Sequence, residues 1–302
     1  MAHSLPIGLV VSLQPSPQEK LRAVRNLGIA TVQVAYTPDF DSPGGIASIR
    51  QALRENNLEI TSLVASFPGE SYRDIPTVRE TVGLVPEATR AERVQRLFAA
   101  SRFAAQLGVP RITTHLGFIP EDAADPRYPS LVETVRGVCD EFGSRGQNFA
   151  LETGQETAAT LHRFIKDVEE DRRANLRVNF DPANMILYGN DDPIAATRLL
   201  APWIDGVHCK DGCWPTEKDQ LGKEMPLGEG DVDVPRWLET LLEVGYRGPL
   251  TIEREIHGPQ QRLDIATAVA LISDCLSRLN ATTEKTALDR QWPSFEVLWD
   301  VK

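Results

Sequence analysis

NFALETG (residues 148–154) is the first of four similar segments, and the others are LRVNFDP (176–182), IDGVHCKDG (204–212) and PLTIERE (249–255). Each is a short run of apolar or β-branched residues, as in a β-strand. Each run ends in one polar side chain of a type that binds metal ions: Glu152, Asp181, His208 and Glu253. Segments of helical period separate the four, which predicts parallel strands that deliver these side chains to one edge.

The same alternation extends over most of the chain and predicts the fold class. Strand-like runs lie at 7–13, 31–37, 60–67, 111–118, 148–154, 176–183, 204–211 and 249–256. Eight strands, each followed by a helix, predict an α/β protein with a (β/α)8 TIM barrel. The rival fold is a doubly wound sheet, whose cofactor-binding version needs GxGxxG after an early strand. Neither Gly44-Gly45 nor the later GEG has that context.

Local signals mark helix ends, long connections and the domain limits. SPQE places Ser16 as the N-cap of a first helix that Gly28 ends. Residues 68–88 and 212–233 are long connections, which in a barrel lie at the catalytic face as lids or substrate walls. We expect one domain over residues 1–280, with residues 281–302 as a C-terminal extension packed on the barrel.

Composition narrows the class of partner. The chain has 302 residues and a net charge of −11, which disfavours a nucleic-acid partner because that would need a basic stripe. No apolar run approaches the ~20 residues of a membrane span, and the first residues lack the basic region of a signal peptide. The four cysteines form no CxxC pair, which predicts reduced thiols and a cytoplasmic protein.

Strand geometry predicts a metal site. If Glu152, Asp181, His208 and Glu253 face the barrel axis, they converge at the carboxyl-terminal mouth, where barrel active sites lie. Carboxylates that point into an apolar barrel are costly unless they are paired or bind a metal. We therefore expect one divalent ion. Mixed carboxylate and imidazole ligation favours Mn²⁺, with Co²⁺, Fe²⁺ or Zn²⁺ as alternatives and Mg²⁺ less suited.

Four stretches resemble the xylose-isomerase-like superfamily of sugar isomerases and epimerases: ALETGQET (150–157), VNFDPANMILYG (178–189), GVHCKDG (206–212) and residues 226–255. The likeness runs from about residue 5 to 280. In the epimerase branch a Glu, Asp, His, Glu quartet binds one divalent metal, and the resemblance assigns those roles to Glu152, Asp181, His208 and Glu253. It further implies that Glu152 and Glu253 are the catalytic acid–base pair.

The expected reaction begins with proton abstraction beside a carbonyl of a keto-sugar. The metal would stabilise the developing enediolate, and one glutamate would remove the proton that the other returns. Return to the opposite face is epimerisation, and return to the neighbouring carbon is isomerisation. Loss of a β-hydroxyl instead would make the enzyme a lyase or dehydratase of a keto-sugar, keto-glycoside or inosose. A non-catalytic sugar-binding barrel is a further alternative, and a homo-oligomer is possible.

The chain departs from the 3-epimerase pattern at two places. Asn184 stands where those enzymes usually carry a histidine, and no arginine occurs between residues 199 and 235, after the metal histidine. The string HCKD resembles inosose dehydratases instead. Lys210 faces the same way as His208, so it could contact a substrate oxygen or pair with Asp211 or other nearby acids. These departures keep the lyase alternative open.

The remaining candidates are substrate ligands. His115, at the end of the fourth strand, could hold a substrate hydroxyl, and Asn184 is a further candidate. Glu156 repeats the facing of Glu152 and could bind sugar or begin the next helix. Arg254 should point outward into a structural ion pair. His3, His162 and His257 are not expected to be ligands.

Overall fold

Eight parallel strands close into a barrel in the computed structural model, which describes residues 5–169 and 174–279. Their order around the barrel is β1, β10, β7, β6, β5, β4, β3, β2. The bounds are β1 Ile7–Val11, β2 Thr31–Ala35, β3 Glu59–Val64, β4 Arg111–His115, β5 Asn148–Glu152, β6 Leu176–Phe180, β7 Ile204–Cys209 and β10 Leu250–Ile252. The predicted TIM barrel is confirmed. The expected extension at 281–302 lies outside the described residues.

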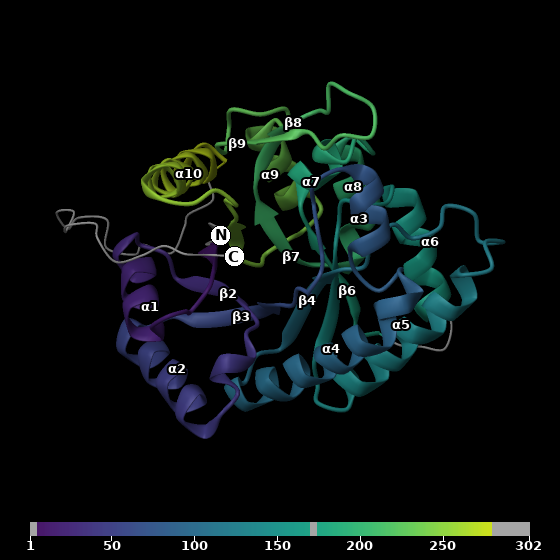
Figure 1. Cartoon of the computed structure of the whole chain (residues 1–302). Coiled ribbons are helices and arrows are strands. Elements are labelled where there is room, and N and C mark those ends of the chain that lie inside the picture. The colour runs from purple at the N-terminus through teal and green to yellow at the C-terminus, as the bar shows by residue number, and fades with distance from the viewer. Residues whose placement is uncertain (1–4, 170–173, 280–302) are drawn as a thin grey trace.

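Helices surround this barrel (Figure 1). They are α1 Pro17–Asn26, α2 Pro43–Asn56, α3 Ile75–Thr81, α4 Glu87–Leu107, α5 Tyr128–Gly143, α6 Ala158–Glu169, α7 Pro182–Leu187, α8 Pro193–Leu200, α9 Val234–Glu243 and α10 Pro259–Arg278. Short 3₁₀ turns lie at Pro38–Phe40 and Ala201–Trp203. Among the described residues, no helix is both long and apolar enough to span a bilayer.

Helix α9 illustrates how the helices attach to the barrel. Its apolar residues Val234, Trp237, Leu238 and Leu241 recur at helical spacing and are buried. Trp237 stacks on Phe180 of the β6 strand, with ring centroids 6.4 Å apart. Its indole N–H donates to Thr197 Oγ1 at 3.1 Å, so the polar atom of this buried ring is satisfied. This packing holds α9 against the strand that leads to Asp181.

The predicted helix signals operate as expected at α1. The backbone N–H of Glu19 donates to Ser16 Oγ at 3.4 Å, so Ser16 is the N-cap. Gly28 follows the helix with φ of +76°, a left-handed conformation that glycine adopts without strain.

Both long connections contain regular structure that the sequence pattern did not predict. Helix α3 lies within residues 68–88. The second connection contains a hairpin of β8 Asp211–Cys213 and β9 Lys223–Met225, which begins one residue before the predicted range of 212–233. The predicted strand at 204–211 therefore ends earlier, at Cys209. The two connections meet where the N–H of Ile75 donates to the carbonyl of Asp219 at 2.9 Å. The hairpin and α7 stand above the barrel mouth (Figure 1).

Asp211 anchors the connection after β7. Its Oδ1 accepts from the N–H groups of Gly212 at 2.8 Å and Val232 at 3.2 Å. Its Oδ2 accepts from Gly228 at 2.9 Å and Gly230 at 3.1 Å. A side chain at position 230 would collide with this carboxylate, since a Cβ there would lie 2.2 Å from Asp211 Oδ1. The carboxylate thus closes residues 211–232 into a fixed loop.

Asp211→Asn is expected to lower the free energy of unfolding by about 2–4 kcal/mol, because an NH₂ group would face backbone donors in a buried site. Urea unfolding would measure the loss. The matched control is Asp231→Asn, in the same loop, whose exposed carboxylate accepts from Trp214 N–H at 3.1 Å. A loss no larger for Asp211→Asn than for Asp231→Asn would contradict the anchoring role.

Candidate active site

The four metal-ligand candidates meet at the carboxyl-terminal end of the barrel. Glu152 ends β5, Asp181 directly follows β6, His208 lies in β7 and Glu253 directly follows β10. One ligand atom from each lies within 4.8 Å of every other. All are buried except Glu253, which is partly exposed. The structure therefore brings together the four side chains that the sequence analysis placed at the ends of the four strand segments.

His208 Nδ1 points at the three carboxylates. It lies 3.2 Å from Glu152 Oε1, 3.2 Å from Glu253 Oε2 and 3.6 Å from Asp181 Oδ2. Burial by itself would lower the pKa of His208, but the negative charges of Glu253 and Glu152 outweigh burial and raise this pKa well above its usual value. The cluster thus attracts positive charge to the point where its ligand atoms converge.

Asp181 provides a direct test of whether a cation fits. Its Oδ1 accepts from the N–H of Asn184 at 2.9 Å and caps helix α7. Its Oδ2 is buried and has no hydrogen-bond partner among the described residues. Its nearest positive groups are His208 Nδ1 at 3.6 Å and Lys210 Nζ at 3.9 Å, beyond hydrogen-bond distance. A bound cation would give this buried oxygen a direct partner. Opposite ligands of an octahedral ion lie about 4.2 Å apart, close to the spread of this cluster.

Gln33, which sequence reasoning missed, orients the histidine. His208 Nε2 lies 3.1 Å from Gln33 Oε1, and Gln33 Nε2 donates to Asn179 Oδ1 at 3.2 Å. Because Gln33 presents its oxygen, it holds a proton on Nε2 of His208, so Nδ1 is the nitrogen that would bind a metal after losing its own proton. Gln33 is in the middle of a buried strand of the barrel, and a buried glutamine in TVQVA was the available signal.

Gln33→Leu is expected to weaken divalent-metal affinity about 10- to 100-fold, since it removes the group that fixes the imidazole. Titration of the apoprotein with Mn²⁺ would measure this affinity. The control is Gln51→Leu, at an exposed site on α2 where Gln51 Nε2 donates to Glu55. Equal affinities in the two variants would show that Gln33 does not position His208.

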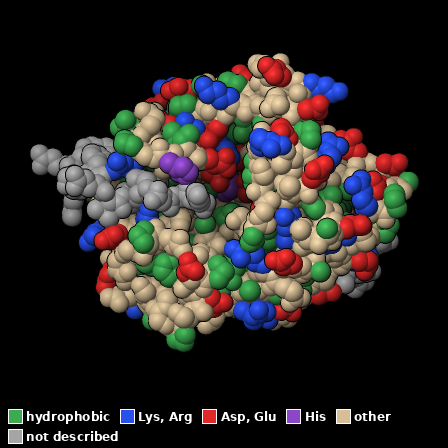
Figure 2. Space-filling view, in the orientation of Figure 1, with side chains coloured by type: hydrophobic (Ala, Val, Ile, Leu, Met, Phe, Trp, Pro, Cys, Tyr) green, Lys and Arg blue, Asp and Glu red, His purple; other side chains and the backbone are tan. Residues whose placement is uncertain are grey.

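A cavity of about 460 Å³ opens onto the cluster. This size lies within the range of about 300–1,000 Å³ for ligand sites. Glu152, Glu253, His115 and Asn184 line it, so these predicted residues share one space. Acidic and histidine side chains gather in a hollow of the visible face (Figure 2). Its position at the barrel mouth is where TIM-barrel active sites lie.

His115 and Asn184 contact the same carboxylate from two sides. Asn184 Nδ2 donates to Glu152 Oε1 at 3.2 Å, and His115 Nε2 lies 3.7 Å from that oxygen. The other ring nitrogen of His115 lies 3.1 Å from Gln155 Nε2. Burial by itself would raise the pKa of Glu152, but the charges of His115 and His208 lower it. Glu152 is therefore held ionised beside the cavity.

Lys210 lies in the cluster and pairs with acids other than Asp211. Its Nζ is 3.1 Å from Glu253 Oε2 and 3.2 Å from Glu255 Oε1, with Asp181 Oδ2 at 3.9 Å. Burial would lower the pKa of Lys210, but the charges of Glu253 and Glu255 raise it well above its usual value. The ammonium group therefore keeps its charge and its proton next to Glu253.

Two further predictions concern residues near the strand ends. Arg254 does point outward, with Nε 2.8 Å from Asp264 Oδ2 and Nη1 3.1 Å from Glu224 Oε1, as expected of a structural ion pair. Glu156 is 3% exposed, is not among the residues that line the cavity, and has an Oε2 without a partner among the described residues. Burial raises the pKa of Glu156 to about 8. Its sugar-binding role stays a prediction.

The family follows from a comparison of the whole barrel. The model of the xylose isomerase-like TIM barrel family matches residues 21–275. The chain belongs to this family. A crystal structure of a xylose isomerase domain protein from Planctomyces limnophilus is 40% identical, with a TM-score of 0.84, over 91% of this chain and 98% of that one.

More distant similarities are to named epimerases. The L-ribulose-5-phosphate 3-epimerase of Shigella flexneri serotype 5b is 24% identical over 278 residues, which cover 84% of this chain and 88% of that protein. The D-psicose 3-epimerase of Clostridium cellulolyticum H10, solved with D-tagatose, has a TM-score of 0.67 at 17% identity, over 92% of this chain and all of that one. The latter similarity shows the shared fold.

The cavity of this family member also has a wall that sequence reasoning missed. Tyr72 comes from the connection that contains α3, Tyr188 follows α7, and His257 follows β10. Gln155 Nε2 donates to the Tyr188 hydroxyl at 3.1 Å and links it to His115. Tyrosines in loops carry no periodic signal, so only the position of the two long connections pointed to them. His257 lines the mouth, although it was not considered a candidate.

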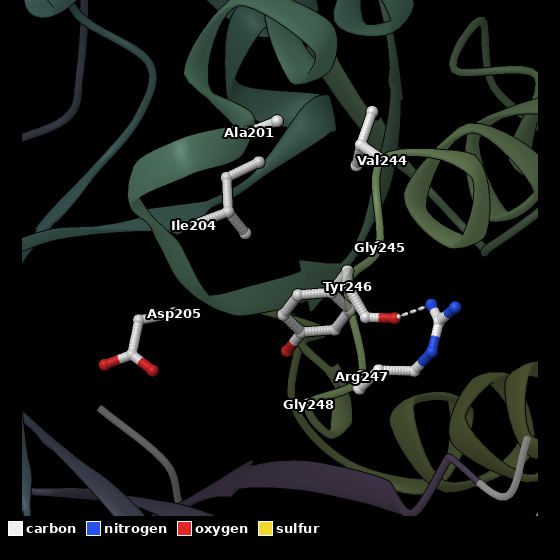
Figure 3. A pocket seen from close by; sticks show the side chains of 8 residues that line it. All are labelled: Ala201, Ile204, Asp205, Val244, Gly245, Tyr246, Arg247 and Gly248. Carbon is white, nitrogen blue, oxygen red and sulfur yellow. Dashed lines mark hydrogen bonds between the residues drawn. The ribbon is translucent and has the colours of Figure 1, made fainter.

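A second hollow lies at the opposite, amino-terminal end of β7 (Figure 3). It measures about 260 Å³, and its lining includes Ile204, Asp205, Tyr246 and Arg247. The Arg247 guanidinium donates to the carbonyl of Tyr246 at 2.6 Å and so supports its own turn. Residues at this end of a barrel usually serve stability. The candidate active site is therefore the cavity above the quartet.

Proposed function

We propose that this protein is a divalent-metal-dependent isomerase or epimerase of a keto-sugar, with Glu152 and Glu253 as the acid–base pair. The observation that carries the proposal is the convergence of these two carboxylates on one point. Their strands, β5 and β10, are separated in the barrel by β6 and β7, so the two groups reach the cavity from distant parts of the rim. Such a pair can remove a proton on one side of a carbon and return one on another.

The ligands of the proposed ion are Glu152, Asp181, His208 and Glu253. Three carboxylates and one imidazole suit Mn²⁺ best, with Co²⁺, Fe²⁺, Zn²⁺ or Mg²⁺ as alternatives. When bound, such an ion would supply the positive charge that stabilises an enediolate. The family membership and the epimerase relatives support the proposed class of reaction.

The protein groups perform the proton transfers. Burial by itself would raise the pKa of Glu253, but His208 and Lys210 lower it well below its usual value, so this carboxylate is ionised and has a free oxygen to receive a proton. The pKa of Glu152 is lowered for a similar reason, so the glutamate that returns a proton must first take one up from solvent or from a substrate hydroxyl. His115 and Asn184 line the same cavity and are proposed to hold substrate hydroxyls, which fixes the carbon between the two glutamates.

Lys210 favours a lyase as the second candidate. Its protonated ammonium lies 3.1 Å from Glu253, next to the proposed site of proton removal. A cation in that place could hydrogen-bond a departing β-hydroxyl, which would leave as water with the proton that Glu253 has taken from carbon. An isomerase or epimerase and a lyase share the first step, removal of a proton from carbon. They differ in whether the β-hydroxyl is then lost.

A solvent-exchange assay would separate the candidates. The purified protein, loaded with Mn²⁺, is incubated in D₂O with ketoses, keto-glycosides and inososes. Deuterium at a carbon-bound position of substrate and product is expected for an isomerase or epimerase, whereas a new ultraviolet-absorbing enone marks a lyase. Metal-loaded protein that binds a sugar but gives neither signal would indicate the non-catalytic sugar-binding alternative and sink the proposal. Cytoplasmic location and a homo-oligomer stay predictions.

A further inference from the structure

The mouth of the barrel is divided into two unlike halves. The quartet comes from β5, β6, β7 and β10, which are neighbours in the barrel order. The other strands include β1, β2 and β3, whose cavity-lining residues are Val10, Ala35 and Val64. A ligand over the metal cluster therefore meets the carboxylates of the quartet on one side. On the other side it meets small apolar strand residues, with Ser66 and Glu70 in the connection that follows β3.

Two tyrosines also line the cavity: Tyr72 follows β3 of the apolar half, and Tyr188 follows α7, after the quartet strand β6. Tyr188 is held by the Gln155 hydrogen bond and by an edge contact with Phe118, with ring centroids 5.9 Å apart. Tyr72 leans against His115 at 5.8 Å between centroids and is 43% exposed. A half-exposed aromatic ring beside a polar cavity can pack against the C–H face of a sugar while the hydroxyls bind the opposite wall.

Charged groups around the mouth have partners of their own. Glu70 accepts from the N–H groups of Phe67 and Gly83 at 2.8 Å each, which holds its carboxylate in place. Glu224 pairs with Arg254 at 3.1 Å, and Glu255 pairs with Lys210 at 3.2 Å. These three acids line the cavity, and Arg254 and Lys210 are committed to two of them, Glu224 and Glu255. A phosphate group, with about −1.5 to −2 charge, would meet fixed carboxylates here.

We infer that the substrate is an unphosphorylated sugar that packs a C–H face on Tyr72. This inference rests on the proposed function, which concerns the carbon atoms of the substrate that react. The inference itself concerns the rest of the substrate. The apolar half of the rim and the two tyrosines receive carbon-bound hydrogens, and the acids at the mouth repel an anionic substituent. Neutral ketoses and keto-glycosides fit these walls, and their phosphate esters do not.

Matched pairs of sugars test the inference. Deuterium uptake from D₂O is measured for free ketoses and for the same ketoses with a terminal phosphate, and the affinity of each is measured by calorimetry with Mn²⁺-loaded protein. We expect kcat/KM and affinity at least tenfold higher for the free sugar. Equal or better values for the phosphate esters would overturn the inference and leave the proposed function intact. Tight binding of free sugars without exchange would overturn the proposed function alone, and no binding of any sugar would overturn both.

Variants of Tyr72 test the contact itself. Tyr72→Ala is expected to raise KM for the free sugar about tenfold with little change in kcat, whereas Tyr72→Phe keeps the ring and is expected to retain KM within about twofold. Leu199→Ala, at a similarly exposed apolar residue on α8 that does not line the cavity, is the control. An unchanged KM in Tyr72→Ala, or equal effects of Tyr72→Ala and Leu199→Ala, would refute the stacking role.

Discussion

Glu152→Gln and Glu253→Gln are each expected to lower kcat by at least about 1,000-fold while the barrel stays folded. The amide keeps the size of the side chain but cannot accept a proton from carbon, and a positioned acid or base contributes about 10²–10⁴ in rate. Each change also replaces a charged ligand of the proposed metal site by a neutral one. The two residues reach the cavity from separate strands, so neither can take over the role of the other.

Deuterium uptake and circular dichroism would be measured on the same preparations. Glu239→Gln is the matched control, because Glu239 is exposed on α9, outside the cavity. It is expected to retain the full rate. If either active-site variant retained more than about a tenth of the wild-type rate, the acid–base assignment would be wrong.

Removal of the proposed divalent ion is expected to lower both activity and thermal stability. A ligand that binds the folded state at 1,000 times its dissociation constant adds about 4 kcal/mol to the free energy of unfolding. For a domain of this size that corresponds to a shift of roughly 8 °C in Tm. The shift arises because the ion binds the assembled cluster of the folded state, which includes Asp181 Oδ2 without a hydrogen bond, and does not bind the unfolded chain. Differential scanning fluorimetry with EDTA and with added Mn²⁺ would measure it.

Asp181→Asn separates the metal role from the capping role. Asparagine is a good N-cap, so the variant can still accept the N–H of Asn184 and keep α7. It loses the charge of the second oxygen, and the Mn²⁺-dependent shift is expected to disappear. Asp192→Asn is the control, since Asp192 caps α8 through Ala195 N–H at 2.8 Å and lies outside the cluster. A full Mn²⁺ shift in Asp181→Asn would contradict the metal site.

The barrel and its quartet were predictable because both depend on local patterns. Apolar runs mark strands, and the residue at the end of each run is fixed in place by that strand alone. In a parallel barrel the carboxyl-terminal ends of all strands lie at one rim. Once eight strands were identified, this geometry predicted that four side chains lie near one another: Glu152, Asp181, His208 and Glu253. The lesser elements were not predictable. Helices α3 and α7 have 7 and 6 residues, too few for a helical period to be recognised.

The sequence pattern could not predict which side chains pair within the site, because these pairs depend on distances between strands. Lys210 faces the cluster by alternation, yet its pairing with Glu253 and Glu255 rather than Asp211 follows from the hairpin, where Asp211 turns to four backbone N–H groups. Gln33 reaches His208 across 175 positions of sequence. Such contacts are set by how the barrel closes.

The sequence by itself determined the fold, the rim that carries the chemistry and the four side chains delivered there, because strand period and strand ends are local properties. Tertiary structure alone decided which atoms face one another. It turned one oxygen of Asp181 toward the cluster, directed His208 Nδ1 at three carboxylates and placed Tyr72 over the cavity. The physical reason is that hydrogen bonds and charge interactions act over a few ångströms, a scale that only the closed barrel fixes.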